Sequence, residues 1–502
     1  MALSKRIQQF TIILKTIILP FSIFVHCPKM ALSLKQGGSF YFKMKRYFTF
    51  FLSLLLYHTL WAAYSPYSTT ELEELEKEFI QQINQSDSVL RHPLANQYIN
   101  HLGKTLARNS QLPIPYFFIV KSNEINAFAG PGGYIGINSQ LILATENESE
   151  LAAVMAHEMA HVRLHHLYRM IQHQKQMRIP ALASILAAAA LGVVNPVLGS
   201  GALMASLTGI AQDNINFTRA NEKEADRIGI DMLIKSGLDP RGMAAFFKKM
   251  QQSSRYYYTA NIPAILRTHP LDEDRIAEAE NRSLSLPQKH YIDSFDYHLF
   301  KELVRTSVAT DNKQLLDYYQ QHCQKNNNIK ACQYGYALAL LNINNYEKAE
   351  NQLNPLLQYE HDNLFFEIAM AQAELGRHQN VRALTRLGEL QANYPDNYAS
   401  LISYAQGLMN AGQAEKAANL LLKGSRMFKQ DLPLCQLLAQ AQAKAHRKDY
   451  AYFTQAQCEL LQGRHHSAIN QLKLAQKLST NDRLLKARIT AKIEEIKFLK
   501  EK

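Results

Sequence analysis

The sequence predicts an α+β fold in which a mainly helical domain with a small antiparallel sheet precedes an all-α superhelix of helical repeats. Two changes of pattern along the chain predict this fold. Between residues 70 and 166, apolar residues recur at three- or four-residue spacing, then at every second position, then again at helical spacing. From about residue 316 onward, small residues recur at one constant period, which is typical of stacked helical hairpins.

Residues 1–63 are predicted to be an export segment. The stretch "MKRYFTFFLSLLLYHTLWAAYS", starting at Met44, has a basic beginning, an apolar run and small residues near which a signal peptide would be cleaved, Ala62 and Ala63. A second apolar run lies upstream, and we interpret Met44 as the true start of translation. A retained membrane anchor is the alternative, although each run is shorter than the ~20 residues that a span needs.

The net charge of +12 is no argument for a nucleic-acid partner. Residues 1–64 hold 8 of the 55 Lys and Arg residues and none of the 43 Asp and Glu residues. The remainder has 47 basic and 43 acidic residues, or +4, which is a mildly basic surface.

The first folded domain is predicted to cover residues 64–300. Residues 70–112 have helical spacing, whereas "PYFFIVKS" and "INAFAGPGGYIGINSQLI" alternate, with Gly130 to Gly133 marking a hairpin turn. A helix that contains "AAVMAHEMAHV" follows. Residues 179–212 have no charged side chain and are broken by Gly and Pro, which indicates a buried helical hairpin; a mobile lid and a membrane-touching loop are the alternatives.

The second domain, residues 301–502, is predicted to consist of repeats of 34 residues. Two series of alanines and one of leucines keep this period: Ala337, Ala371, Ala405 and Ala439; Ala349, Ala383, Ala417 and Ala451; Leu353, Leu387 and Leu421. Small residues at two fixed positions allow two helices to cross closely, so the units resemble the tetratricopeptide repeat. A degenerate unit with Ala456 and Ala468 closes the series, and the array is expected to bind protein or peptide in a groove.

Four cysteines follow the export segment, and all lie in the repeats. In an oxidising compartment they could form two disulfides, of which Cys323–Cys332 and Cys435–Cys458 are the most local pairing. Four buried thiols are the alternative.

A candidate metal site begins with His157 and His161, which lie four residues apart and hence on one face of a helix. Glu158 lies beside them as a candidate general base, since Zn²⁺ lowers the pKa of a bound water to about 7. Histidines that are satisfied inside a core are the alternative. His165 and His166 do not fit the metzincin spacing, and we assign both to the surface or to a second layer around the site.

A third ligand is expected downstream, in the helical segment "RANEKEADRIGIDML". Glu222 and Asp226 lie four residues apart on one face, so Glu222 is the predicted ligand and Asp226 is predicted to orient a ligating histidine. Glu224 is the competing ligand on another face of the helix. With either glutamate, the site has two histidines, one glutamate and one water.

These motifs, together with "NAFAGPGGYIGIN" before them and "THPLDEDRI" after them, resemble the CAAX-prenyl-protease-like zinc metallopeptidases over roughly residues 90–285. The resemblance implies a zincin-type peptidase with one Zn²⁺ per chain, bound by His157, His161 and Glu222. It also implies that Glu158 is the general base and that Asp226 orients a ligating histidine.

The same resemblance implies roles for four further residues. Asn126 and Ala127 match an edge strand that pairs with the substrate backbone. His269, in "THP", matches a histidine that approaches the metal and either takes the position of the water or stabilises the oxyanion. Arg275 matches an arginine of the same motif and is assigned to substrate binding.

The export segment and the C-terminal repeats are similar to those of the periplasmic members of this family, which degrade misassembled outer-membrane β-barrel proteins and assist their assembly. The resemblance therefore implies a periplasmic endopeptidase whose repeats bind the β-barrel assembly machinery or substrates, with a possible peripheral membrane contact and no nucleic acid. A periplasmic chaperone or scaffold with latent or absent proteolysis is the alternative function. The intact Glu158 favours the enzyme.

Overall fold

The computed structural model describes residues 69–108, 114–170, 212–256, 263–286, 289–323 and 329–500. The predicted export segment, residues 1–63, and residues 179–211 of the charge-free stretch lie outside the described residues. In the described ranges, no helix is both long and apolar enough to cross a membrane.

A four-stranded sheet lies in the first half of the chain. Its strands stand in the order β1-β2-β4-β3. Their bounds are β1 (Val89–Leu90), β2 (Tyr116–Val120), β3 (Ala127–Ala129) and β4 (Tyr134–Asn138). β1 pairs with β2 and β3 with β4 in antiparallel fashion, but β2 and β4 are parallel, with Tyr116 opposite Tyr134 and Val120 opposite Asn138. The prediction of an antiparallel sheet is therefore wrong for its central pair.

The connections explain this topology. β3 and β4 form a hairpin through the 3-10 turn η2 (Pro131–Gly133), in which Gly132 and Gly133 have positive φ angles of 72° and 79°. Such angles suit glycine, because it has no Cβ. The six-residue link between β2 and β3 leaves room for one strand between them in the sheet. β4 takes this place, next to both, and runs parallel to β2. The strand β1 falls inside a segment that the sequence predicted to be helical throughout.

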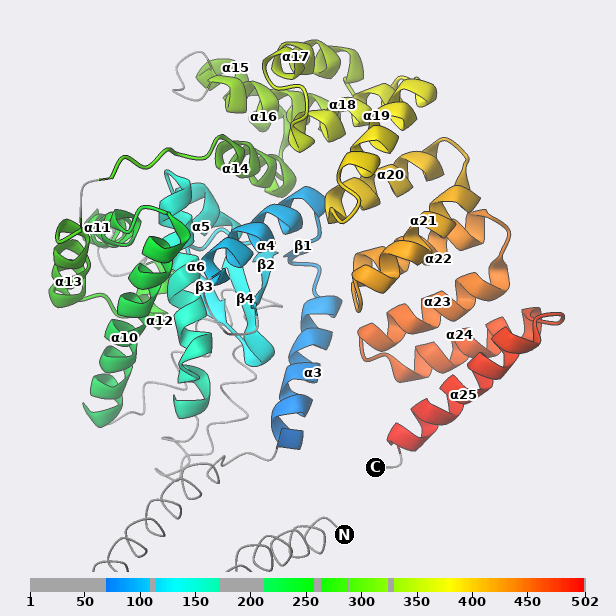
Figure 1. Cartoon of the computed structure of the whole chain (residues 1–502), viewed down its shortest axis with the longest axis horizontal. Helices are drawn as coiled ribbons and strands as arrows, with labels where there is room; N and C mark the ends of the chain where they lie inside the picture. The colour runs from blue at the N-terminus through cyan, green and yellow to red at the C-terminus, as the bar shows by residue number, and fades with distance from the viewer. Residues whose placement is uncertain are drawn as a thin grey trace, which may run out of the picture. The chain divides into compact units, whose positions relative to one another are not determined.

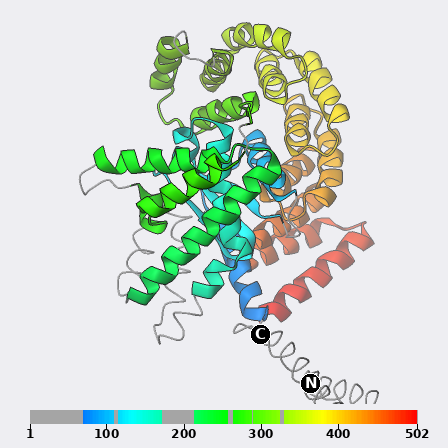
Figure 2. The ribbon, with the colours of Figure 1, turned by 60° about the vertical axis from the view of Figure 1, so that its left-hand side comes forward.

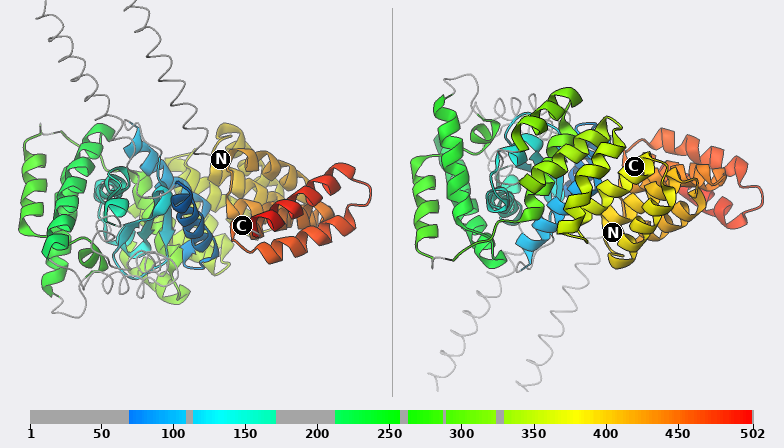
Figure 3. Two further views of the ribbon diagram at one scale, coloured as in Figure 1. Left: turned by 90° about the horizontal axis from the view of Figure 1, so that it is seen from below. Right: turned by 90° about the horizontal axis from the view of Figure 1, so that it is seen from above.

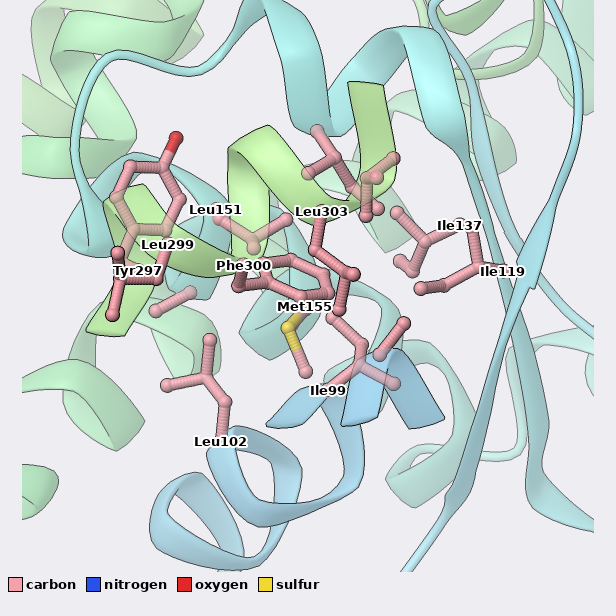
Figure 4. Close-up of a cluster of buried hydrophobic side chains, with 14 of the residues drawn as sticks. Ile99, Leu102, Ile119, Ile137, Leu151, Met155, Tyr297, Leu299, Phe300 and Leu303 are labelled. Carbon is pink, nitrogen blue, oxygen red and sulfur yellow. The ribbon is translucent and has the colours of Figure 1, made fainter. Parts of the chain in front are cut away.

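Helices surround this sheet (Figure 1). They are α3 (Thr69–Gln85), α4 (Pro93–Ala107), α5 (Ser139–Ala144), α6 (Glu148–Arg163), α10 (Gln212–Ser236), α11 (Arg241–Tyr256), α12 (Ala264–Thr268), α13 (Glu273–Leu284) and α14 (Phe295–Val308). α6 lies at the centre of this group and packs on β3, α4, α10 and α11, and its position beside α10 is also visible in Figure 2. The apolar core between the sheet and the helices contains Ile99, Ile137, Met155 and Phe300 (Figure 4).

The repeat helices follow in a row of antiparallel pairs. They are α15 (Asn312–His322), α16 (Ile329–Asn342), α17 (Tyr346–Tyr359), α18 (Leu364–Gly376), α19 (Asn380–Asn393), α20 (Tyr398–Asn410), α21 (Ala414–Met427), α22 (Leu432–Lys444), α23 (Lys448–Leu461), α24 (His465–Leu478) and α25 (Arg483–Lys500). Each helix packs on the next, and α25 lies along α24 at the end of the row (Figure 3). The alanines of both 34-residue series are buried, as the predicted close crossing requires.

Both local disulfides are present, Cys323–Cys332 and Cys435–Cys458. The expected boundary between residues 300 and 301 falls inside α14. This helix packs on α4 and α5 on one side and on α16 on the other.

Candidate metal centre

Helix α6 presents the two histidines of the motif from a buried position. It begins at the N-cap Asn147, whose side chain accepts a hydrogen bond from Glu150 N at 2.9 Å. Acidic residues in its first turn suit the positive end of the helix dipole. Every residue from Glu150 to Ala160 is buried. The polar side chains of His157 and Glu158 therefore need partners inside the protein.

Helix α10 supplies the carboxylates. It crosses α6 closely at Gly229, where an added Cβ would lie 3.2 Å from the backbone N of His157. This crossing brings Glu222 and Asp226, two turns and one turn earlier in α10, against the histidine face of α6. Both side chains are buried, at 3% and 6% exposure.

Four side chains converge on one point. His157, His161, Glu222 and His269 each offer a ligand atom, and these atoms all lie within 4.8 Å of one another. His157 Nε2 and His161 Nε2 are 3.3 and 3.4 Å from the carboxylate oxygens of Glu222. His269 follows the short helix α12, and its Nδ1 lies 3.1 Å from Glu222 Oε1.

Glu158 lies at the edge of this cluster, and its Oε1 lacks a hydrogen bond within the described residues. Its side chain is 1% exposed, and its Oε1 makes no hydrogen bond with any residue that the structure describes. The nearest polar atom given for it is His269 Nε2, at 3.4 Å. A buried carboxylate oxygen left unpaired is costly, so the site fits an additional group next to Glu158, such as a water or a substrate.

Asp226 holds His157 from the side away from the cluster. Its Oδ1 is 2.8 Å from His157 Nδ1, so the N–H of this ring nitrogen donates to Asp226 when Nε2 serves as a ligand. Arg275 donates to both oxygens of Asp226, at 2.7 and 2.9 Å, and lies 3.1 Å from Glu222. At 2% exposure, the guanidinium of Arg275 fixes the two carboxylates, which argues against the substrate-binding role suggested by the resemblance.

His161 is held from behind by a second histidine. α6 ends at Arg163, and His165 adopts a positive φ of 54°, which turns the chain back. His166 is thereby buried with its Nδ1 2.9 Å from His161 Nδ1, while its Nε2 lies 3.3 Å from Glu224. Of the two residues assigned to the surface or to a second layer, His165 is exposed and His166 lies in the second layer.

Glu224, the competing ligand, lies outside the cluster. Besides His166, it accepts a hydrogen bond from Arg169 at 3.0 Å. Neither Arg169 nor the contact between Arg275 and Asp226 was predicted. A buried arginine near two carboxylates could have been expected only once the fold was known, because residues 226 and 275 lie on separate helices.

The charges of the cluster are arranged for a cation. Burial lowers the pKa of His157, but hydrogen bonds to Asp226 and Glu222 raise it more, to about 10. Burial raises the pKa of Glu222, but the imidazoles of His269 and His161 lower it well below its usual value. Burial and the neighbouring imidazoles hold the pKa of His161 well below its usual value, against the attraction of Glu222. The carboxylates thus stay ionised, and a cation that binds here displaces a proton from His157.

Strand β3 forms one edge of the sheet and packs on α6. Ala127 pairs with Ile137, and Asn138 N donates to Asn126 O at 3.0 Å. Because main-chain groups alternate in direction along an antiparallel strand, those of Ala127 point away from β4. The carbonyl of Asn126 is used within the sheet, so Ala127 has the better position for pairing with a substrate. That role stays a prediction for both residues.

An apolar cavity of about 30 Å³ adjoins His157 and His269. Its other walls come mainly from α11 and α12 and include Met243, Met250 and Leu266. The cavity is too small for a large side chain, but methionines adapt their shape readily. An apolar substrate side chain next to the cleaved bond could therefore enter if the methionines move.

Comparisons with known proteins show the family of this chain. Residues 93–283 match Peptidase family M48. The β-barrel assembly-enhancing protease of Escherichia coli (strain K12) is 34% identical over 432 residues, which cover 84% of this chain and 87% of that protein. The protease of the same name from Yersinia pestis is 32% identical over 428 residues, covering 84% and 88%.

A shorter relative matches a smaller share of the chain. The metalloprotease LoiP of Escherichia coli (strain K12) is 30% identical over 184 residues, which cover 36% of this chain and 67% of LoiP. Among solved structures, a tetratricopeptide repeat protein from Parabacteroides merdae covers 56% of this chain and 95% of its own, at 12% identity and a TM-score of 0.26, too low a score to support a conclusion. From the M48 match and the extent of the longer alignments, the chain belongs to the family of β-barrel assembly-enhancing proteases and is a metalloendopeptidase.

Proposed function

We propose that this protein is a periplasmic zinc-dependent endopeptidase that degrades misassembled outer-membrane β-barrel proteins and assists their assembly. The observation that carries the catalytic part is the convergence of His157, His161 and Glu222 beside Glu158, whose Oε1 makes no hydrogen bond in the described part of the chain. Two neutral imidazoles and one carboxylate are a common ligand set of catalytic zinc, which leaves a position open.

The residues of the chain would act as follows. Bound Zn²⁺ supplies Lewis-acid polarisation of the scissile carbonyl and acidifies a water. Glu158 accepts a proton from the attacking water and passes it to the leaving amine. Asp226 keeps the ring of His157 in one tautomer, and the outward main-chain groups of Ala127 pair with an extended substrate.

His269 gives the site a means of restraint. Its ring nitrogens lie 3.1 Å from Glu222 and 3.4 Å from Glu158, in the space that a water and a substrate carbonyl would need. This position favours a resting state of low activity, in which His269 must move before cleavage. These contacts of His269 are the observation behind the second candidate function, a chaperone with latent proteolysis.

The cellular role is proposed from the relatives. Their name refers to β-barrel assembly, and a predicted signal peptide with cleavage near Ala62 or Ala63 would deliver this chain to the periplasm. Two disulfides suit that oxidising compartment. The repeats would then bind the assembly machinery or its unfolded substrates.

The test compares the wild type with Glu158→Gln in cleavage of casein, together with the zinc content of both. We expect the variant to keep its zinc and to lose at least about a hundredfold in rate, as befits loss of a general base. His269→Ala should change the basal rate, and Glu222→Gln should lose zinc. Equal cleavage by the wild type and Glu158→Gln would refute the catalytic assignment.

A further inference from the structure

We propose that three glutamines of the repeat domain bind the main chain of an extended polypeptide without regard to its sequence. Gln372, Gln406 and Gln440 are 34 residues apart and occupy the same position in α18, α20 and α22. We call them the glutamine ladder. The proposal rests on the proposed function in one respect, since a peptidase for misassembled proteins meets such chains.

The three side chains line one groove. It encloses about 370 Å³ and runs across helices that pack directly on one another, α18 on α20 and α20 on α22. All three glutamines are exposed, and none of them forms a hydrogen bond within the part of the chain that the structure describes. The groove therefore offers three unpaired carboxamides in a row.

A carboxamide is the side-chain counterpart of a peptide group. It has a carbonyl that accepts and an NH₂ that donates two hydrogen bonds, so one glutamine can meet both main-chain groups of a residue. Lys444 is the one charged residue among those that line the groove. The lining thus suits a neutral backbone better than a charged terminus or an acidic motif.

The spacing of the ladder fits an extended chain. Packed helices lie about 8–10 Å apart, and an extended chain advances about 3.3 Å per residue. Successive glutamines would therefore contact residues of the bound chain that lie about three apart, and the whole ladder would hold about seven residues. One repeat before the ladder the equivalent position is the buried Leu338, so the polar row has a defined beginning.

The experiment measures binding of a fluorescein-labelled twelve-residue peptide of alternating serine and valine by fluorescence anisotropy. The full-length protein carries Glu158→Gln so that the peptide is not cut. The ladder variant is Gln372→Leu, Gln406→Leu and Gln440→Leu. The control variant is Asn351→Leu, Thr385→Leu and Asn419→Leu, which changes exposed polar residues at one shared position of α17, α19 and α21, the helices that precede those of the ladder.

We expect the ladder variant to bind at least about tenfold more weakly, from the loss of several hydrogen bonds, and the control variant to stay within twofold. A peptide with N-methyl groups on alternate amides should bind weakly to all three proteins. Wild-type affinity of the ladder variant, or no effect of methylation, would overturn the proposal. With Glu158 intact, unchanged cleavage of a short fluorogenic peptide by the ladder variant separates this result from a failure of the metal centre.

Discussion

At the scale of single residues, His166 shows how a side chain outside the ligand set can prepare a ligand. If His161 presents Nε2 to the metal, its Nδ1–H donates to His166 Nδ1, and His166 Nε2–H donates to Glu224. Each ring then has one tautomer that satisfies all its contacts.

We predict that His166→Ala lowers zinc affinity by about tenfold, because groups that orient a ligating histidine typically contribute a factor of 10–100. Competition with a chelator measures this affinity. His165→Ala is the matched control, since this neighbouring histidine is exposed and should have wild-type affinity. Equal affinity of both variants would show that the contact between His161 and His166 has no role in binding.

The ligand residues were accessible from the sequence because helical spacing alone places residues four apart on one face. That rule selected Glu222 together with Asp226, and the structure brings both to His157. The position of His166 was less accessible. It depends on the left-handed backbone conformation of His165, which is more usual for glycine or asparagine. The residue types near His165 therefore did not predict this turn.

At the scale of elements, the disulfide Cys435–Cys458 joins α22 and α23 across 23 residues. We predict that replacing both cysteines by serine lowers the free energy of unfolding of the repeats by about 3 kcal/mol, because the unfolded chain regains the freedom that the cross-link removed. Urea unfolding, followed by circular dichroism, measures the change. A variant that unfolds at the wild-type midpoint would contradict it.

The small sheet marks a limit of sequence analysis. Alternation identified β2, β3 and β4, and the glycine run identified their hairpin, because both are local patterns. The parallel pairing of β2 with β4 is a long-range outcome of which strand fills the middle position. β1 has only two residues, too few to show an alternation of apolar and polar residues, and was therefore not predicted. In contrast, the regular repeats were predictable, since each of these units repeats the same local pattern.

At the scale of the whole described chain, α3 contacts the last repeats. Asn84 Nδ2 and Gln85 Nε2 donate to the carbonyls of Leu461 and Gln462 at 2.9 and 2.5 Å. Gly463 allows this approach, as an added Cβ would lie 2.3 Å from Gln81 Oε1.

We predict that Asn84→Ala with Gln85→Ala speeds hydrogen exchange of the α3 amides by roughly tenfold, because two hydrogen bonds of about 0.5–1.5 kcal/mol each are lost. Mass spectrometry of deuterium uptake measures this effect. Glu78→Ala, an exposed position on the same helix, is the control. Unchanged deuterium uptake in α3 would mean that these hydrogen bonds do not stabilise the helix.

Helix α14 has a practical consequence for dissecting this protein. Its Phe300 stacks on Tyr98 at 4.3 Å and Tyr297 bonds to Thr145, while the other side of the helix meets α16. A peptidase fragment that ends before residue 295 lacks α14 and would expose an apolar surface beside Tyr98. A repeat fragment that begins after residue 308 would expose the side of α16 that α14 covers. Either fragment produced alone should aggregate unless it includes α14.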